Sequence, residues 1–398
     1  MKKSKMLSLG GLNGFMYGMN AVYYAFIPLY LGGIFDSVRK GQLLSIGPIV
    51  TCFALIFWGR VADISKTKNR VLAGIVGGAA VCFAVLTVQS TFLYTAIMLA
   101  LLLFFMAPYS SLTDTVTLEA LREGNAPYGP FRLMGTIGYG AIAIVTGFAA
   151  GMDTRRLVWV YIAVAVAAVI CIVTSPLVYG GSHRSRREAG PTETEKLTGR
   201  RPSLRPILLN PDFVLIMLID IVVVFSWYFT QNFLPTHLSD NYGMTSGFWG
   251  ISICLTLVIE FPFFGFFDRI FSKISLRTLL IVSVIFSVAR YAVLAFTHGG
   301  TMLLVVSVLT GGWVTVVMYC AVYYIHLVAP PELHATGMSV NLAIGSALPQ
   351  VMAGQIGGLL VRSFGFQASE LFCAVACALC LLPAFFLPKG VYLIYGKK

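Results

Sequence analysis

Long uninterrupted runs of apolar residues are the feature of this chain that most limits how it can fold. Leu157–Val173 and Ala96–Ala107 are two of them. A lipid core about 30 Å thick needs about 20 apolar residues per helix, because a helix rises about 1.5 Å per residue. The runs are continuous, whereas the strands of a membrane β-barrel alternate apolar and polar residues. The pattern therefore predicts an all-α membrane protein.

The composition agrees with this fold class. Of the 398 residues, 58% are hydrophobic and 11% are charged, whereas soluble domains carry about 25% charged residues. The length accommodates about twelve spans joined by short loops. We expect helices near residues 7–34, 42–61, 71–89, 92–121, 131–151, 157–179, 211–237, 247–270, 278–297, 301–329, 336–362 and 368–393.

The distribution of basic residues indicates the orientation of these helices. The net charge of +12 is spread in short clusters between apolar runs, which argues against nucleic-acid binding. With the N-terminus inside, 21 of the 28 lysines and arginines fall in cytoplasmic segments and five in external loops. Basic loops are retained in the cytoplasm. We therefore predict a multi-pass protein of the cell inner membrane with both termini in the cytoplasm.

One long polar stretch, from Gly180 to Asn210, interrupts the apolar pattern. It has little apolar surface to bury, as in a linker. This predicts an N-terminal six-helix bundle at residues 1–180, a cytoplasmic linker at 181–209 and a C-terminal six-helix bundle at 210–398.

The two predicted bundles repeat one another. Landmark residues recur at nearly constant offsets of 206, 207 or 210 positions: Pro28 and Pro235, Gly59 and Gly265, Arg70 and Arg277, Gly135 and Gly345. Parallel repeats of this kind occur in transporters, with a binding site between the halves.

At this point the chain resembles the major facilitator superfamily. The stretch Gly59–Asp63, followed by Lys66, Lys68 and Arg70, is similar to that superfamily's loop between helices two and three. Tyr128–Gly138 together with Asp114, Glu260 with Arg290, and Ala335–Met338 resemble the branch that holds lactose permease, nucleoside–proton symporters and phenylpropionate permease-like proteins. The resemblance implies secondary transport by alternating access. The His-x-x-Glu pair of the lactose permease's tenth helix is missing, so its proton handling does not carry over intact.

Asp114 and Arg132 are the first candidate site residues. An ionisable side chain at the centre of a bilayer costs about 2.5–3.5 kcal/mol on insertion scales, so each needs a reason. The two lie on predicted helices four and five, which are adjacent and antiparallel, and they are placed to pair. A guanidinium suits a carboxylate, a sugar diol or a nucleobase edge. The pair either binds substrate, as the resemblance implies, or braces the bundle.

Further polar and aromatic residues extend this candidate substrate site. Helix one carries Asn13, Tyr17, Asn20 and Tyr24 on one face, and helices five and seven add Thr136, Gln231 and Asn232. From helix one we choose Asn20 and Tyr24 as substrate contacts. Amide and aromatic surfaces suit a small polar ring. The alternative is helix–helix packing, since amides and tyrosines also join membrane helices.

Candidates for proton coupling and gating complete the set. Glu260 is the first choice for proton carrier, with Arg290 as its modulator. Asp220 is the second choice and His326 a weaker one, and each has a structural alternative as a packing group. Asp63 and Asp268, at the cytoplasmic ends of helices two and eight, are placed to latch one transport state, together with Gly59 and Arg70.

The sequence therefore predicts a proton-coupled importer of a small polar solute such as a sugar, nucleoside or aromatic acid. Its partners are that solute, the proton and the lipid bilayer, and we expect a monomer without cofactor or metal. An exporter of amphipathic compounds is the alternative within transport. A membrane-embedded enzyme or sensor is the alternative outside it, although no HExxH, GxSxG or Walker signature is present.

Overall fold

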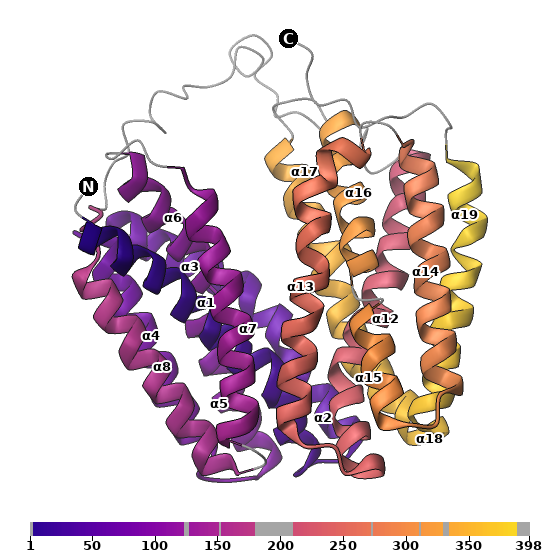
Figure 1. The fold of residues 1–398 in the computed structure, drawn as a ribbon, viewed down its shortest axis with the longest axis horizontal. Helices are drawn as coiled ribbons and strands as arrows, with labels where there is room; N and C mark the ends of the chain where they lie inside the picture. The colour runs from indigo at the N-terminus through magenta and orange to yellow at the C-terminus, as the bar shows by residue number, and fades with distance from the viewer. Residues whose placement is uncertain are drawn as a thin grey trace. The chain divides into compact units, whose positions relative to one another are not determined.

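The computed structural model describes residues 3–122, 127–150, 153–179, 210–271, 274–309, 312–328 and 334–387. These residues form helices (Figure 1), and β pairing among them is limited to one bridge between Thr67 and Tyr179. Within the described ranges, eight helical segments are long and apolar enough to cross a membrane. The predicted all-α class is confirmed, while the number of twelve spans and the side of the termini stay predictions.

The helices follow in this order: α1 (Lys3–Gly32), α2 (Ser37–Leu44), α3 (Ile46–Ile64), α4 (Lys68–Leu86), α5 (Phe92–Met106), α6 (Tyr109–Arg122), α7 (Gly129–Ala150), α8 (Thr154–Thr174), α12 (Pro211–Tyr242), α13 (Ser246–Phe271), α14 (Leu276–Phe296), α15 (Gly300–Leu309), α16 (Gly312–Val328), α17 (His334–Val340), the π-helix η2 (Asn341–Ala347), α18 (Leu348–Leu379) and α19 (Leu381–Phe386).

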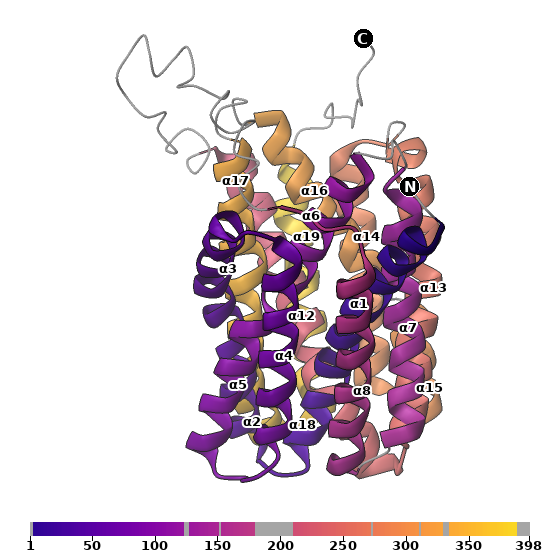
Figure 2. The same ribbon diagram turned by 90° about the vertical axis from the view of Figure 1, so that its left-hand side faces the viewer.

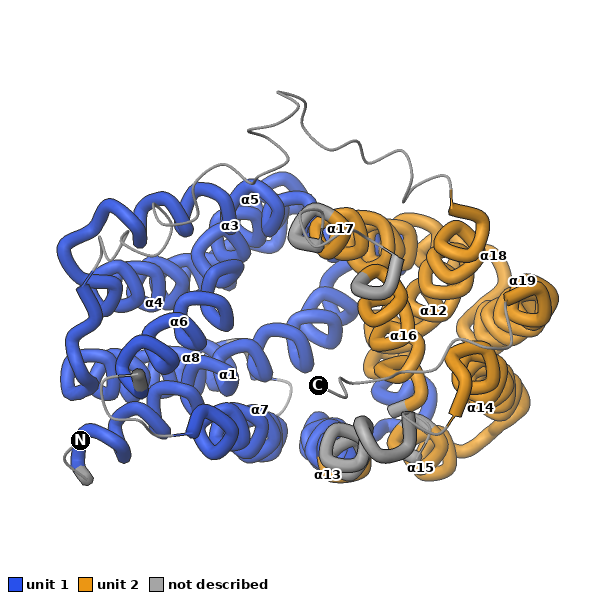
Figure 3. Tube along the Cα trace, turned by 90° about the horizontal axis from the view of Figure 1, so that it is seen from above, with its two compact units in different colours: residues 1–187, 238–257 blue, residues 188–237, 258–398 orange. Residues whose placement is uncertain are grey.

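The chain divides into two compact units (Figure 3). Unit 1 comprises residues 1–187 and 238–257, and unit 2 comprises residues 188–237 and 258–398. Helices α12 and α13 therefore each contribute to both units. The predicted linker at residues 181–209 lies outside the described residues, and the predicted domain limits stay predictions.

Unit 1 is built around α1, which packs against α7 and α8, as Figure 2 shows. Glycines permit this close approach. A Cβ atom on Gly138 of α7 would overlap the backbone of Gly14 of α1, and one on Gly135 would lie 2.7 Å from the Tyr17 ring. Small residues let membrane helices pack tightly, because no hydrophobic force drives them together in lipid. Gly135 and Gly138 therefore allow α1 and α7 to pack closely.

Within unit 1, the segment 238–257 contacts α1 and α7. The Trp249 indole Nε1 donates a hydrogen bond to the Ala25 carbonyl at 3.0 Å, and the Ser246 hydroxyl donates to the Gly147 carbonyl at 2.9 Å. Both acceptors are backbone carbonyls in α1 and α7, so the segment is fastened by side-chain donors on α13.

Two of the predicted helices are not single continuous α-helices. The predicted helix at 92–121 is two helices, α5 and α6, separated at Ala107 and Pro108. Proline has no N–H and clashes with the preceding turn. The predicted helix at 336–362 combines α17, η2 and the first part of α18. At Gly365 the φ angle is 79°, a left-handed conformation that favours glycine, and there the chain turns between the last two predicted spans.

Side-chain caps fix where other helices begin. The Asn210 Oδ1 atom accepts hydrogen bonds from the N–H groups of Asp212 and Phe213 at the start of α12. The Asp36 carboxylate does the same for Val38 and Arg39 at the start of α2. Such caps satisfy donors that the first helical turn leaves unpaired. They begin α2 several residues earlier than hydropathy predicts.

We predict that the stability of unit 1 depends on the close Gly14–Gly138 contact. Gly138→Ala should lower the midpoint of thermal unfolding of the purified protein in detergent, since overpacking costs about 1–3 kcal/mol. Gly74→Ala on α4 is the matched control, because a Cβ there meets nothing within 4 Å and alanine is favoured over glycine in a helix by about 1 kcal/mol. Equal midpoints for the two variants would contradict the prediction.

Candidate functional site

A tyrosine joins the two predicted charges of unit 1. The Tyr17 hydroxyl on α1 lies 3.4 Å from both carboxylate oxygens of Asp114 on α6. The guanidinium of Arg132 on α7 stands over the same tyrosine ring, 4.3 Å from its centroid. Among the described residues there is no direct ion pair between Asp114 and Arg132 within 4.0 Å. The predicted pair is therefore connected through Tyr17.

This arrangement holds opposite charges apart without neutralising them. A cation above an aromatic face is attracted by the ring quadrupole, by about 0.5–2 kcal/mol according to solvation. That attraction occupies one face of the guanidinium and leaves its N–H edge for a ligand. Arg132 is exposed and Asp114 is half-buried. A small molecule with both hydrogen-bond donors and acceptors can therefore interact with both groups.

Tyr128, immediately before α7, completes the cluster. Burial raises the pKa of the Tyr128 phenol, and a hydrogen bond with the Asp114 carboxylate raises it further. The phenol therefore keeps its proton near neutral pH and donates a hydrogen bond to the Asp114 carboxylate. Sequence analysis included Tyr128 in a family motif without a role, and the cluster gives it one.

The remaining predicted residues of unit 1 divide between packing and exposure. The Asn13 amide is fully buried and donates to Leu9 O and Thr117 Oγ1, both at 2.9 Å. Asn13 therefore serves helix packing, although it lies on the helix face that the sequence predicts to be polar. Asn20 is half-buried, Tyr24 is 49% exposed, and Thr136 lies one turn after Arg132 on α7, half-buried.

Unit 2 contains its own buried polar cluster. Arg290 of α14 is 1% exposed, with its guanidinium 4.7 Å from the Trp227 ring centroid. Glu370 of α18 is completely buried, and its Oε1 atom accepts a hydrogen bond from the Thr230 hydroxyl at 2.8 Å. The sequence analysis missed Glu370. The available signal was a carboxylate within the predicted last helix.

The other predicted residues of unit 2 lie as follows. Asp220 of α12 is 1% exposed and faces Gly345 of η2. Gln231 is half-buried and Asn232 is buried, both on α12. The side chains of Glu260, Asp268 and His326 lie outside those that the structure describes.

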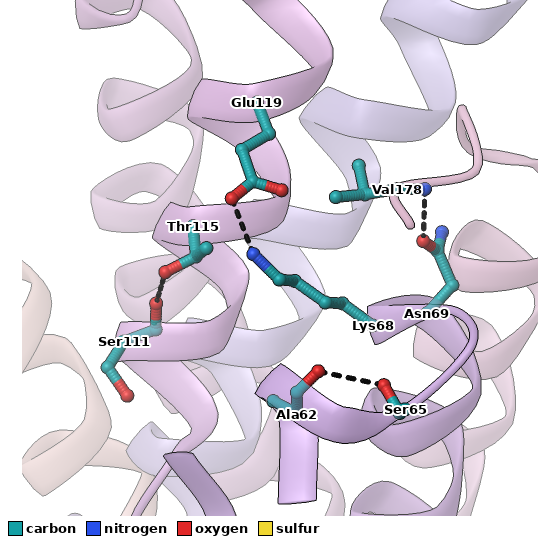
Figure 4. Close-up of polar contacts among 8 residues, drawn as sticks. All are labelled: Ala62, Ser65, Lys68, Asn69, Ser111, Thr115, Glu119 and Val178. Atoms are coloured by element: carbon teal, nitrogen blue, oxygen red, sulfur yellow. Dashed lines mark hydrogen bonds and ion pairs between the residues drawn. The ribbon is translucent and has the colours of Figure 1, made fainter. Parts of the chain in front are cut away.

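The predicted gating residues of unit 1 surround a different contact. Gly59 and Arg70 are exposed and Asp63 is half-buried, and within the described residues Asp63 and Arg70 make no ion pair. Instead, Lys68 Nζ of α4 lies 2.5 Å from the Glu119 carboxylate of α6 (Figure 4). Sequence analysis named Lys68 only as part of a family loop and did not select Glu119.

Asn69, next to Lys68, ties the start of α4 to the chain after α8. Its amide donates to Ser175 Oγ at 2.9 Å and to the Pro176 carbonyl at 3.1 Å. Its Oδ1 accepts from Val178 N at 2.9 Å (Figure 4). The side chain is 4% exposed. Every hydrogen-bonding atom of this amide is used, which fixes the α3–α4 turn against the end of α8.

Comparison with known proteins identifies the family. The model of the MFS_1 like family matches residues 6–373. The chain belongs to the MFS_1 like family. The predicted membership of the major facilitator superfamily is confirmed, and the protein is a multi-pass membrane transporter rather than an enzyme.

Two curated relatives cover most of this MFS_1-like chain. The uncharacterized transporter YwbF of Bacillus subtilis strain 168 is 25% identical over 323 residues, which cover 81% of this chain and 77% of that protein. The maltose permease of Geobacillus stearothermophilus is 22% identical over 345 residues, which cover 86% and 84%.

Solved structures of other transporters share the fold. The nucleoside transporter NupG superposes with a TM-score of 0.81 at 17% identity, covering 97% of this chain and all of that one. A bacterial homolog to the human lysosomal transporter Spinster, inward-facing and unoccupied, has a TM-score of 0.74 at 14% identity and covers 97% of each chain. These likenesses establish the fold alone.

We predict that Arg132 contacts the transported solute through its planar fork. For the solute that most raises the thermal midpoint of the purified protein in a screen of sugars, nucleosides and aromatic acids, Arg132→Lys should weaken binding about tenfold to hundredfold. A charge-assisted hydrogen bond contributes about 1.5–3 kcal/mol, and lysine lacks the fork. Arg155→Lys, at an exposed position of α8, is the control. Equal effects in calorimetric titrations would assign Arg132 to packing.

We also predict that the Lys68–Glu119 contact stabilises unit 1. A double-mutant cycle with Lys68→Met and Glu119→Gln should give a coupling energy of about 1 kcal/mol or more in thermal unfolding, because Lys68 is buried and Glu119 is half-buried. The Arg156–Asp153 pair is 70% and 51% exposed, and its cycle should give a coupling energy near zero. Additive effects at Lys68 and Glu119 would refute the prediction.

Proposed function

We propose that this transporter is a proton-coupled importer of a small polar solute that works by alternating access. The observation that carries the proposal is the cluster of Asp114, Tyr17 and Arg132. Its charges are of opposite sign and are separated by one aromatic ring. Each charged group retains hydrogen-bonding capacity, which is unusual for a purely structural contact in a membrane.

The chemistry of the cluster fits a ring with hydroxyl or carboxylate groups. The guanidinium of Arg132 donates in a planar fork, the carboxylate of Asp114 accepts, and the tyrosine ring offers a face for stacking. A sugar, a nucleoside or an aromatic acid presents complementary groups. The relatives named maltose permease and nucleoside transporter support the first two classes. In this proposal Asn20, Tyr24, Thr136, Gln231 and Asn232 supply further contacts to the solute.

The coupling and gating residues remain those that the sequence predicts. Glu260 or Asp220 carries the proton, Arg290 modulates it, and His326 is a weaker candidate. The burial of Asp220 supports its candidacy, because a buried carboxylate favours the neutral, protonated form. Gly59, Asp63, Arg70 and Asp268 belong to the proposed gate.

The architecture that we propose has twelve spans in two six-helix halves, at residues 1–180 and 210–398, joined by a cytoplasmic linker at 181–209. Both termini lie in the cytoplasm, the location is the cell inner membrane, and the working unit is a monomer. The charge distribution and the offset repeat of Pro28 and Pro235 support this arrangement. Both prolines lie in the last quarter of a long helix, α1 and α12.

We predict that transport is coupled to proton movement. Vesicles containing the purified protein should show alkalinisation of the outside medium when the solute is added, because uptake carries protons inward. A pH-sensitive dye in the outer medium measures this change. Glu260→Gln or Asp220→Asn should abolish the signal, since neither amide takes up a proton, whereas Asp153→Asn at the exposed start of α8 should retain it. Undiminished alkalinisation in both carboxyl variants would exclude the assigned carriers.

A further inference from the structure

Asp220 is a buried carboxylate whose charge is not compensated by a described neighbour. It lies in α12 with 1% of its surface exposed, and its Oδ1 atom has no hydrogen-bond partner among the described residues. No basic side chain of the described ranges lies within 4.0 Å of it. An unpaired charge in a low-dielectric interior is destabilised by several kcal/mol. Something therefore neutralises this group in the folded protein.

A second unpartnered oxygen lies on the helix that faces Asp220. Asn341 is 7% exposed, and its side-chain Oδ1 atom also lacks a partner within the described part of the chain. An amide oxygen buried without a donor loses about 1–3 kcal/mol relative to a satisfied one. Two buried acceptors on facing helices cannot satisfy each other, because neither has a proton to donate.

Gly345 lies beside both side chains, next to Asn341 Oδ1 and to Oδ2, the other carboxylate oxygen of Asp220. A Cβ atom on this glycine would lie 3.0 Å from Asn341 Oδ1 and would overlap Asp220 Oδ2. One oxygen of each side chain therefore lies close to this glycine, whose lack of a side chain permits the approach. The two side chains that meet beside Gly345 are both polar.

The backbone around this point is a π-helix. The seven residues Asn341–Ala347 form η2, between α17 and α18. In a π-helix the hydrogen bonds run to the fifth residue, and such segments are frequent at functional sites. Transporters hold coupling ions where a membrane helix departs from regular α geometry, with carbonyl oxygens among the ligands. The irregular segment thus coincides with the converging acceptors.

Three described groups from two helices face Asp220. From η2 come Asn341 and Gly345, and from α16 the Cys320 thiol, which is 1% exposed and interacts electrostatically with Asp220. Among described residues, no cluster of three histidine, cysteine or carboxylate ligands is present for a transition metal. A single carboxylate and an amide oxygen match one positive charge.

We propose that Asp220 and Asn341, with the η2 segment at Gly345, bind one monovalent cation, a proton or a sodium ion. As a proton, it resides on the Asp220 carboxyl group, which then donates a hydrogen bond to Asn341 Oδ1. As sodium, it is coordinated by the carboxylate and amide oxygens. Either cation neutralises the buried carboxylate and gives the Asn341 amide oxygen a partner. The role of this cation in driving solute uptake rests on the transport function proposed above, whereas its binding does not.

Infrared difference spectroscopy of the protein in lipid vesicles tests the site without any solute. In potassium chloride, acid-minus-alkaline spectra of the wild type should contain a protonated-carboxyl band that Asp220→Asn removes and Asn341→Ala shifts. This result assigns a proton. If sodium, but not potassium, replaces that band by a carboxylate band at constant pH, the cation is sodium. Asn341→Ala should then raise the sodium concentration required by at least tenfold.

The control is Asp212→Asn, the same substitution near the start of α12, where the carboxylate accepts a hydrogen bond from Tyr324 at 3.1 Å. It should leave the band unchanged. Gly345→Ala should alter the band as Asn341→Ala does, because its methyl group would occupy the volume between the oxygens. Size-exclusion chromatography selects folded, monodisperse samples. If Asp220→Asn does not fold, Asn341→Ala and Gly345→Ala still test the site, because both keep the carboxylate and should shift its band.

Two results would overturn the site. One is a wild-type spectrum that changes neither with pH nor with sodium at any band removed by Asp220→Asn. The other is an Asn341→Ala titration identical to that of the wild type. If the band titrates but the protein moves no ion with its solute, the cation site stands and proton-coupled transport is rejected. Failure of the site and failure of the proposed function are therefore distinguishable.

Discussion

The interior of a lipid bilayer has no water for backbone N–H and C=O groups, so each must bond within the protein. The long α-helices of this chain follow from that constraint, and so do the places where they break. The division between α5 and α6 coincides with Pro108, and the turn within α18 coincides with Gly365 in a left-handed conformation. The π-helix η2 is tolerated because Asn341 and Gly345 are buried in protein.

The same constraint governs the few ionisable side chains inside the two units. Three solutions are present among the described residues. Lys68 and Glu119 neutralise each other directly. Asp114 and Arg132 share a tyrosine that holds them apart. Asp220 has neither arrangement. The first solution suits a stable structure, the second suits a ligand that enters and leaves, and the third requires a cation small enough to be buried.

Sequence reasoning succeeded where a signal extends over many residues. Apolar runs predicted the all-α fold class, and the stretch from Gly59 to Arg70 indicated the superfamily. It also selected Asp114, Arg132 and Asp220, because a charge in an apolar run is conspicuous. The sequence placed Tyr17 on the polar face of helix one but did not indicate which side chain it contacts. Which helix it meets depends on helix rotation, which the Gly14–Gly138 contact sets.

The features that sequence reasoning missed depend on small differences in register. Nothing in the residues 341–347 distinguishes a π-helix from an α-helix, because the change is one residue in the hydrogen-bond pattern. Lys68 and Asn69 lie beside the predicted gating residues Asp63 and Arg70, yet only the geometry of the α3–α4 turn decides which of them contact α6 and α8. Such choices are made by packing and leave no periodic signal.

The repeat offset relates Asn13 of α1 to a residue of different chemistry in α12. Asp220 lies 207 positions after Asn13, the offset that separates Pro28 from Pro235, and both side chains are buried on the first helix of their half. One copy carries an amide bonded to Thr117, and the other carries an acid. At the same offset, Tyr17 corresponds to Val224, which is fully buried and apolar. At this offset the two helices therefore differ in what they carry: α1 has the tyrosine between two charges, and α12 has the buried titratable group.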